Sequence, residues 1–161
     1  MPDYLALKNA LNTTYANMSD AEILSILNTA NVELTIDVPT QSVINYLGVN
    51  GILPIVRGWV NNVPPLTFSS NVSQQTAATL AAQTFGLMIG PPPLWDALLM
   101  SNPTTNVQIT GMVDILVEAG LIPSVHANNI LNMSKSNTSQ ASIWGWENGI
   151  YENDILAARK I

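Results

Sequence analysis

The chain of 161 residues contains no cysteine, which excludes disulfides, thiolate catalysis and the common cysteine-based zinc sites and suits a reducing cytosol. Charge is also scarce, because Asp, Glu, Lys and Arg make up only 10% of the residues, against about 25% in typical globular domains. Only five residues are Lys or Arg, and the net charge is −6. Binding to nucleic acid or to an anionic membrane surface needs clustered cations, so we expect neither partner.

Long apolar segments are missing as well. No apolar run reaches the roughly 18 residues of a transmembrane helix, and the first residues lack the cationic and apolar regions of a signal peptide. The glycines form neither a dinucleotide-binding pattern nor a P-loop, so no nucleotide cofactor is predicted.

Hydrophobic residues make up 47% of the chain, and its polar residues are mainly amides and hydroxyls. Neutral surfaces protect a free monomer poorly from association, and charged residues are depleted at the centres of protein interfaces. One interpretation is therefore a chain that buries its surface against partners. The other is a drifted, AT-rich genome that favours Asn and Ile codons. The two interpretations are compatible.

The spacing of apolar residues predicts an all-α fold of eight or nine short helices in a compact, bundle-like domain. Helices are predicted at residues 3–12, 20–28, 73–85, 107–119, 124–133 and 154–160, and shorter ones at 52–60, 94–100 and 140–146. A further helix start is predicted at residues 39–42, with Val43, Ile44 and Leu47 following it. Ser19 and Glu22 have the spacing of a capping box, and Gly120 is a helix stop. Ser73 and Asn153 are the predicted N-caps of their helices.

Extended structure is predicted only at residues 32–38, where apolar and polar residues alternate. A lone short strand needs a partner strand, and the sequence offers no convincing one. Residues 135–138 are a predicted polar linker, and residues 61–72 a loop. We expect a single domain over residues 1–161, with a helical part at 1–60, a Pro- and Gly-rich middle at 61–93 and a helical part at 94–161.

Few residues are candidates for chemistry. His126 is the only histidine, and Asp114 and Glu118 share one face of a predicted helix. A catalytic triad, an acid–base pair or a cation site would each need further partners close by, and the sequence suggests none. We therefore interpret His126 as a packed or exposed helix residue, the two acids as a solvated face and Asp96 as a cap or exposed position. No catalytic, cofactor-binding or metal-binding residue is predicted, and no enzyme activity is expected.

Two stretches, one near each end of the chain, carry distinctive motifs. The first combines an L-K-x-x-L helix with M-S-D and L-N, and the second combines an A-G-L-I turn with a final D-I-x-x-A-R. The residues concerned are Leu7, Lys8, Leu11, Tyr15, Met18, Ser19, Asp20, Leu27 and Asn28, then Ala119, Gly120, Leu121, Ile122, Ser142, Gly145, Gly149, Ile150, Asp154, Ile155, Ala158 and Arg159. In these residues the chain resembles small helical proteins encoded by tailed bacteriophages. It departs from that family at residues 143–149, where the family has an acidic, Leu-rich stretch.

The resembling family is encoded among virion structural genes and has no assigned catalytic residues. The resemblance implies a non-enzymatic virion structural protein, made in the bacterial host cytoplasm and assembled in multiple copies in a symmetric particle. Together with the low charge and the neutral surface, the resemblance favours a small connector that binds other tail proteins near the tail-fibre attachment region. A capsid decoration or cement protein and a soluble assembly chaperone are the alternatives.

The predicted protein interface lies in the C-terminal part that resembles the phage family. Trp144 and Trp146 lie at the end of the predicted helix at 140–146, and Ile150 and Tyr151 lie before the next one. Aromatic residues are enriched in interface hot spots, so we expect these four residues at a contact with another virion protein. The alternatives are that one tryptophan fills the core, that the two tryptophans stack on a carbohydrate ring, and that the interface lies at residues 32–38 or 61–93.

Overall fold

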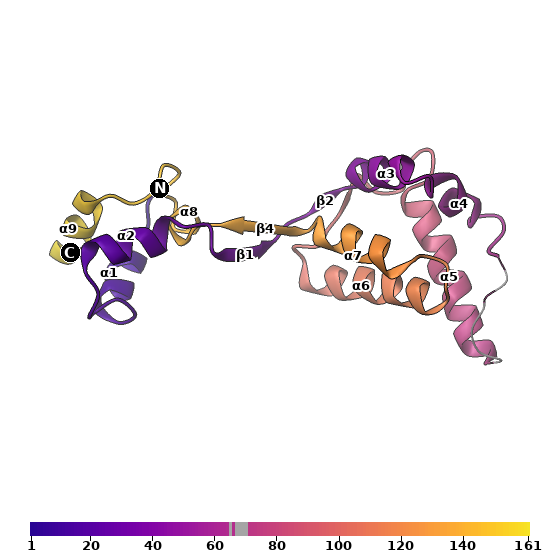
Figure 1. The fold of residues 1–161 in the computed structure, drawn as a ribbon, viewed down its shortest axis with the longest axis horizontal. Coiled ribbons are helices and arrows are strands. Elements are labelled where there is room, and N and C mark those ends of the chain that lie inside the picture. The colour runs from indigo at the N-terminus through magenta and orange to yellow at the C-terminus, as the bar shows by residue number, and fades with distance from the viewer. Residues whose placement is uncertain (65, 67–70) are drawn as a thin grey trace. The chain divides into compact units, whose positions relative to one another are not determined.

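The computed structural model describes residues 1–64, 66 and 71–161, and it confirms the prediction of a mostly helical chain (Figure 1). The described residues form nine helices and four short strands. The helices are α1 (Tyr4–Asn12), α2 (Asp20–Asn28), α3 (Thr40–Val49), α4 (Leu53–Gly58), α5 (Val72–Met88), α6 (Pro103–Glu118), α7 (Ser124–Asn132), α8 (Gln140–Ile143) and α9 (Glu152–Lys160). The strands are β1 (Val32–Thr35), β2 (Val38–Pro39), β3 (Ala97–Leu98) and β4 (Lys135–Thr138). Within this part of the chain, no helix combines the length and hydropathy that a membrane span requires.

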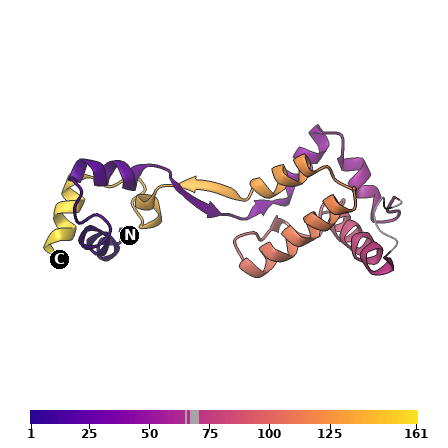
Figure 2. The ribbon, with the colours of Figure 1, turned by 60° about the horizontal axis from the view of Figure 1, so that its bottom comes forward.

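The chain divides into two compact units. The first contains residues 1–34 and 136–161, and the second contains residues 35–135. The chain passes from one unit to the other twice, in β1 and in β4, and these two strands pair with each other (Figures 1 and 2). The expected grouping into residues 1–60, 61–93 and 94–161 does not follow this division, because the two ends of the chain share one unit. The assignment of a single domain stays a prediction.

The first unit is held together by the apolar faces of α1, α2, α8 and α9. Leu7 and Leu11 of α1 and Ile23 and Leu27 of α2 are buried at the three- and four-residue spacing of a helix face. They pack in one cluster with buried residues of the C-terminal segment, namely Ala141, Trp146, Ile150, Ile155 and Ala158. Neither end of the chain buries its apolar face without the other.

The second unit packs α3 to α7 around its own core. Helices α5 and α6 lie side by side (Figures 1 and 2), and α4 packs on α5. Gly86 allows the close approach of α4 to α5, because a Cβ at this position would lie 2.9 Å from the carbonyl oxygen of Val56. Phe85 and Trp59 are the largest fully buried side chains of this core.

Two local predictions are confirmed. Ser19 and Glu22 form the capping box of α2, in which the Glu22 carboxylate accepts from the Ser19 N–H at 2.9 Å. Gly120 follows the C-cap residue of α6 and has φ 70°, a conformation that glycine adopts without steric cost.

Three helix starts differ from the predictions. Asn71 rather than Ser73 caps α5, because its Oδ1 accepts from the Ser73 N–H at 3.0 Å. Asn102 caps α6 through the N–H groups of residues 104 and 105, so this helix begins at Pro103 instead of residue 107. The predicted cap Asn153 lies inside α9, whose N-cap residue is Tyr151.

The restriction of extended structure to residues 32–38 is wrong. The predicted linker at residues 135–138 is strand β4, which pairs with β1, and the predicted helix at 94–100 is replaced by a loop and β3. Strand β3 pairs antiparallel with β2, with Val38 opposite Leu98 and Pro39 opposite Ala97. The helix was predicted wrongly because a short apolar run fits a helix and a buried strand equally well. The part of the predicted loop at residues 65 and 67–70 lies outside the described residues.

Candidate functional site

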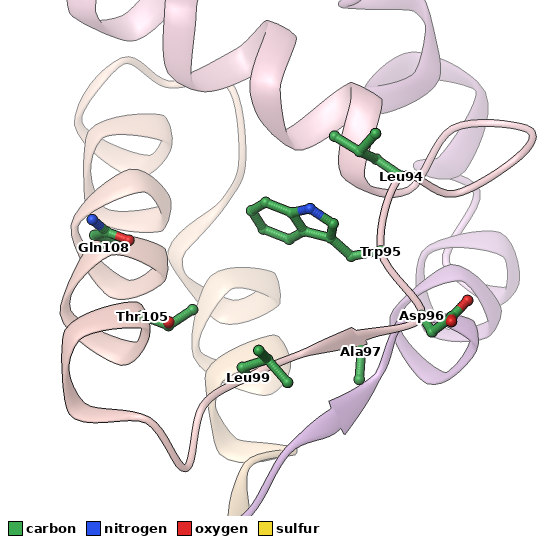
Figure 3. A pocket seen from close by; sticks show the side chains of 7 residues that line it. All are labelled: Leu94, Trp95, Asp96, Ala97, Leu99, Thr105 and Gln108. Carbon is green, nitrogen blue, oxygen red and sulfur yellow. The ribbon is translucent and has the colours of Figure 1, made fainter.

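The candidate site is an apolar groove in the second unit, centred on Trp95 (Figure 3). Its volume is about 540 Å³. Seven residues line it, from the segment around β3 and from the start of α6: Leu94, Trp95, Asp96, Ala97, Leu99, Thr105 and Gln108. We call this surface the Trp95 groove.

Strand β3 positions one wall of the Trp95 groove. Its pairing with β2 buries Leu98, which is 1% exposed. Successive side chains of a strand point to opposite faces, so the residue after Leu98 is directed outward, and Leu99 is 51% exposed. The pairing with β2 therefore sets which apolar side chains reach the groove.

Helix α6 supplies the opposite wall. Asn102 caps the helix, and Pro103 occupies its first turn, where a missing N–H costs nothing. Thr105 and Gln108 are three residues apart and project from the same side of the helix toward the indole of Trp95 (Figure 3). A second hollow of about 200 Å³ continues the groove between α5 and α6. It is lined by Thr84, Met88, Trp95, Thr105, Gln108, Ile109 and Met112.

The side chains of the Trp95 groove are mostly apolar and accessible. Trp95 is 43% exposed and Leu94 is 61% exposed. Asp96 carries the only charge among the lining residues, and its side chain is exposed while its carbonyl oxygen accepts from the Thr40 N–H at 2.9 Å. The expectation that Asp96 is an exposed position is therefore confirmed, although the helix predicted around it is absent. The groove offers an apolar floor with one carboxylate at its edge.

His126 takes part in a polar contact between α3 and α7. Its Nδ1 lies 2.8 Å from the hydroxyl of Tyr46, and this hydroxyl also accepts from Asn129 Nδ2 at 2.8 Å. The rings of Tyr46 and His126 meet edge to face, with centroids 5.8 Å apart. This arrangement confirms the interpretation of His126 as a packed helix residue.

The paired acids of α6 lie on the surface. Asp114 and Glu118 are both exposed, as expected of a solvated face. In the part of the chain that the structure describes, no three His, Cys, Asp or Glu side chains come close enough to share a metal ion.

The four residues predicted at an interface fall into two groups. Trp146 and Ile150 are buried in the core of the first unit. Trp144 is half-buried against that core, and Tyr151 is 63% exposed. Trp146 meets the ring of Tyr4 edge to face at 5.1 Å, so it fills the core as the alternative interpretation expected. The interface itself stays a prediction, and only Trp144 and Tyr151 could offer it surface.

A carboxylate lies among these aromatic residues. Burial tends to raise the pKa of Asp154. Hydrogen bonds from the Tyr151 backbone N–H, the Tyr4 hydroxyl and the Trp146 side chain outweigh this effect and hold the pKa below its ordinary value. The Tyr4 hydroxyl donates to Asp154 Oδ1 at 2.8 Å, and the Tyr151 N–H donates to Oδ2 at 3.0 Å. The network ties α1 to α9 and has a structural role.

Sequence reasoning missed the Trp95 groove. The available signal was the juxtaposition of Leu94 and Trp95 directly after three prolines, which do not continue a helix. No protein-family model matches the chain, and no curated protein or solved structure matches it either.

Proposed function

We propose that this chain is a non-enzymatic structural protein of a bacteriophage virion, which binds another tail protein in the Trp95 groove as a small connector. The observation that carries the proposal is the exposed apolar surface formed by Leu94, Trp95 and Leu99. Contiguous apolar surface on a water-soluble unit marks sites of protein contact. The resemblance of both ends of the chain to small phage proteins supports the assignment to a virion.

The chemistry of the Trp95 groove suggests what the partner supplies. An apolar side chain would cover Trp95 and displace water from the indole. A Lys or Arg beside it would meet the Asp96 carboxylate, which has no cationic neighbour among the lining residues. The proposed partner segment is therefore apolar with one cation, presented by a tail protein near the tail-fibre attachment region.

The experiment is quantitative mass spectrometry of purified particles that carry either the wild-type chain or a variant. We expect Trp95→Ala to reduce incorporation strongly, because tryptophan truncation at an interface centre costs about 2 kcal/mol or more. The matched control is Val125→Ala, which shortens an exposed apolar residue of α7 outside the groove. Circular dichroism of both purified variants checks that they fold.

Copy number separates this proposal from its alternatives. A connector is present as one small ring per particle, whereas a decoration or cement protein is present in proportion to the capsid subunits. An assembly chaperone is absent from finished particles. Normal incorporation of a folded Trp95→Ala variant would show that the groove is not the binding site.

A further inference from the structure

We propose that α5 is a self-association surface, which pairs with α5 of a second copy of this chain. The surface consists of side chains along one side of the helix, and we call it the α5 face. Its members are Val72, Thr76, Thr79, Leu80, Gln83 and Leu87. Self-association of the chain does not depend on its assignment to a virion, so each can be refuted without the other.

The α5 face is apolar and accessible, although α5 packs into the second unit on its other side. Ala78, Ala82 and Phe85 are buried, whereas Leu80 is 63% exposed and Leu87 is 48% exposed. The two leucines are seven residues apart, which is the repeat that aligns helices in a coiled coil. A shallow hollow of about 420 Å³ runs along this side, and the described residues that line it all belong to α5.

The threonines of the α5 face add little polarity to it. The Thr76 hydroxyl donates to the Val72 carbonyl at 2.8 Å, and the Thr79 hydroxyl donates to the Gln75 carbonyl at 2.8 Å. These hydroxyls keep their hydrogen bonds when water is removed, and their methyl groups extend the apolar surface. Burying the face therefore avoids the free-energy cost of leaving a polar group unpaired.

Charge indicates that the occupant is a second copy. Each chain carries a net charge of −6, so two copies repel each other over most of their surface. In a two-fold interface the same patch meets itself, so a patch that carries charge of one sign meets like charge. The sequence contains no Asp, Glu, Lys, Arg or His between Arg57 and Asp96, a stretch that includes the whole of α5. The α5 face can thus pair with itself without bringing like charges together.

Length and position define the expected complex. A helix of 17 residues is about 25 Å long, so the contact is limited to one short pair of helices, whereas stable interfaces bury about 1,000 Å² or more. We therefore expect a concentration-dependent dimer. Leu80 is the middle residue of Val72–Met88, so full overlap places it opposite Leu80 of the other copy, whether the helices run parallel or antiparallel.

The test measures the mass of the full chain in solution by light scattering and sedimentation over a range of concentrations. The wild-type chain should approach twice its mass of 17.3 kDa. Leu80→Glu and Leu80→Lys should each weaken self-association on the order of a hundredfold or more, because like charges face each other across the contact. An equimolar mixture of the two variants should restore the dimer. Val125→Glu is the matched control, since it adds the same charge at an exposed residue of α7.

Three results would overturn the α5 pairing: a wild-type monomer at the highest soluble concentration, a Leu80→Glu variant that still dimerises, and a mixture that stays monomeric. Circular dichroism confirms that the variants are folded. The mass of the chain in solution is measured without particles, so this test does not depend on incorporation into a virion. A chain that dimerises through α5 but is absent from particles would contradict the virion proposal alone.

Discussion

The side chain of Asn28 links the two ends of the chain within the first unit. Its Oδ1 accepts from the Ile150 N–H at 2.7 Å, and its Nδ2 donates to the Ile150 carbonyl at 2.8 Å. Ile150 itself is 2% exposed. Replacing Asn28 by alanine removes the hydrogen-bond partners of both the N–H and the carbonyl of Ile150, and we expect it to lower the free energy of unfolding.

The structure sets the size of the loss. A neutral hydrogen bond contributes about 1 kcal/mol net, and a buried polar group without a partner costs about 1–3 kcal/mol. A hollow of about 470 Å³ lined by Asn28 and Ile150 lies beside the pair, so water can reach the freed groups. We therefore expect Asn28→Ala to destabilise the protein by about 2 kcal/mol, near the sum of two ordinary hydrogen bonds.

Asn28→Asp separates the two hydrogen bonds. At neutral pH the new carboxylate can accept from the Ile150 N–H but cannot donate to the Ile150 carbonyl, which it repels. Protonation restores a donor, so folding raises the pKa of the introduced carboxyl. Stability from a group with a raised pKa is present at low pH and is lost as pH rises through that value. The free energy of unfolding of Asn28→Asp should therefore approach that of the wild type as pH falls.

Urea unfolding followed by circular dichroism at several pH values measures these effects. Asn132→Ala is the matched control, because Asn132 is also an exposed last residue of its helix, α7. We expect the control to change the unfolding free energy by less than about 0.5 kcal/mol. If Asn28→Ala costs no more than Asn132→Ala, the link to Ile150 contributes nothing to stability and the reasoning is refuted.

Three further predictions use the same measurement. Gly86→Ala should destabilise the protein by about 1–3 kcal/mol, because the added Cβ would lie 2.9 Å from the Val56 carbonyl oxygen. Gly111→Ala is the comparison, since a Cβ there meets nothing within 4 Å, and it should stabilise α6 by up to about 1 kcal/mol. Equal changes in the free energy of unfolding would contradict this expectation. Thr40→Val should leave the free energy of unfolding unchanged or raise it by about 1 kcal/mol, because the Thr40 hydroxyl is buried without a hydrogen-bond partner among the described residues. A clear fall in the free energy of unfolding would show that this hydroxyl has a partner. Because the pKa of Asp154 is lowered on folding, its contribution is present above the ordinary carboxyl pKa and is lost as pH falls through the lowered value. The stability gap between the wild type and Asp154→Asn should therefore shrink on acidification, and a constant gap would argue against the network.

The helices could be predicted from the sequence because their signals are local. The capping box of Ser19 and Glu22 joins residues three apart, and the stop at Gly120 depends on its own φ. Both features are complete within one or two helical turns. Sequence reasoning therefore predicted the helix count and most helix positions, although it placed the starts of α5, α6 and α9 imperfectly.

The strand pairs could not be predicted, because each strand depends on a distant partner. Strand β4 is polar throughout and has no strand pattern of its own, and β3 lies in an apolar run that also suits a helix. The backbone of Val38 pairs with that of Leu98, far along the chain. The Trp95 groove was missed for the same reason, since β3 orients the side chains that line it.

The predicted interface shows why aromatic residues alone do not define a surface. Trp144 and Trp146 are two residues apart and have the same chemistry, yet only Trp146 is buried. Its burial depends on Tyr4 and Asp154, which come from opposite ends of the chain. The sequence neighbours of Trp146 do not reveal these contacts.

The structure bears on the two interpretations of the amide-rich composition. An amide side chain can donate and accept at once, so Asn28 satisfies both backbone groups of Ile150, which a carboxylate or an ammonium group cannot do. Asn71 and Asn102 cap their helices by accepting hydrogen bonds, a role that aspartate fills equally well. Asparagine at such caps is compatible with genome drift, whereas the position of Asn28 requires a side chain that both donates and accepts. The α5 face carries one amide and no charge, so it brings no like charges together between identical copies. The amide at Asn28 thus closes the first unit by pairing with both backbone groups of Ile150, and the absence of charge on α5 removes one obstacle to the proposed pairing of two copies.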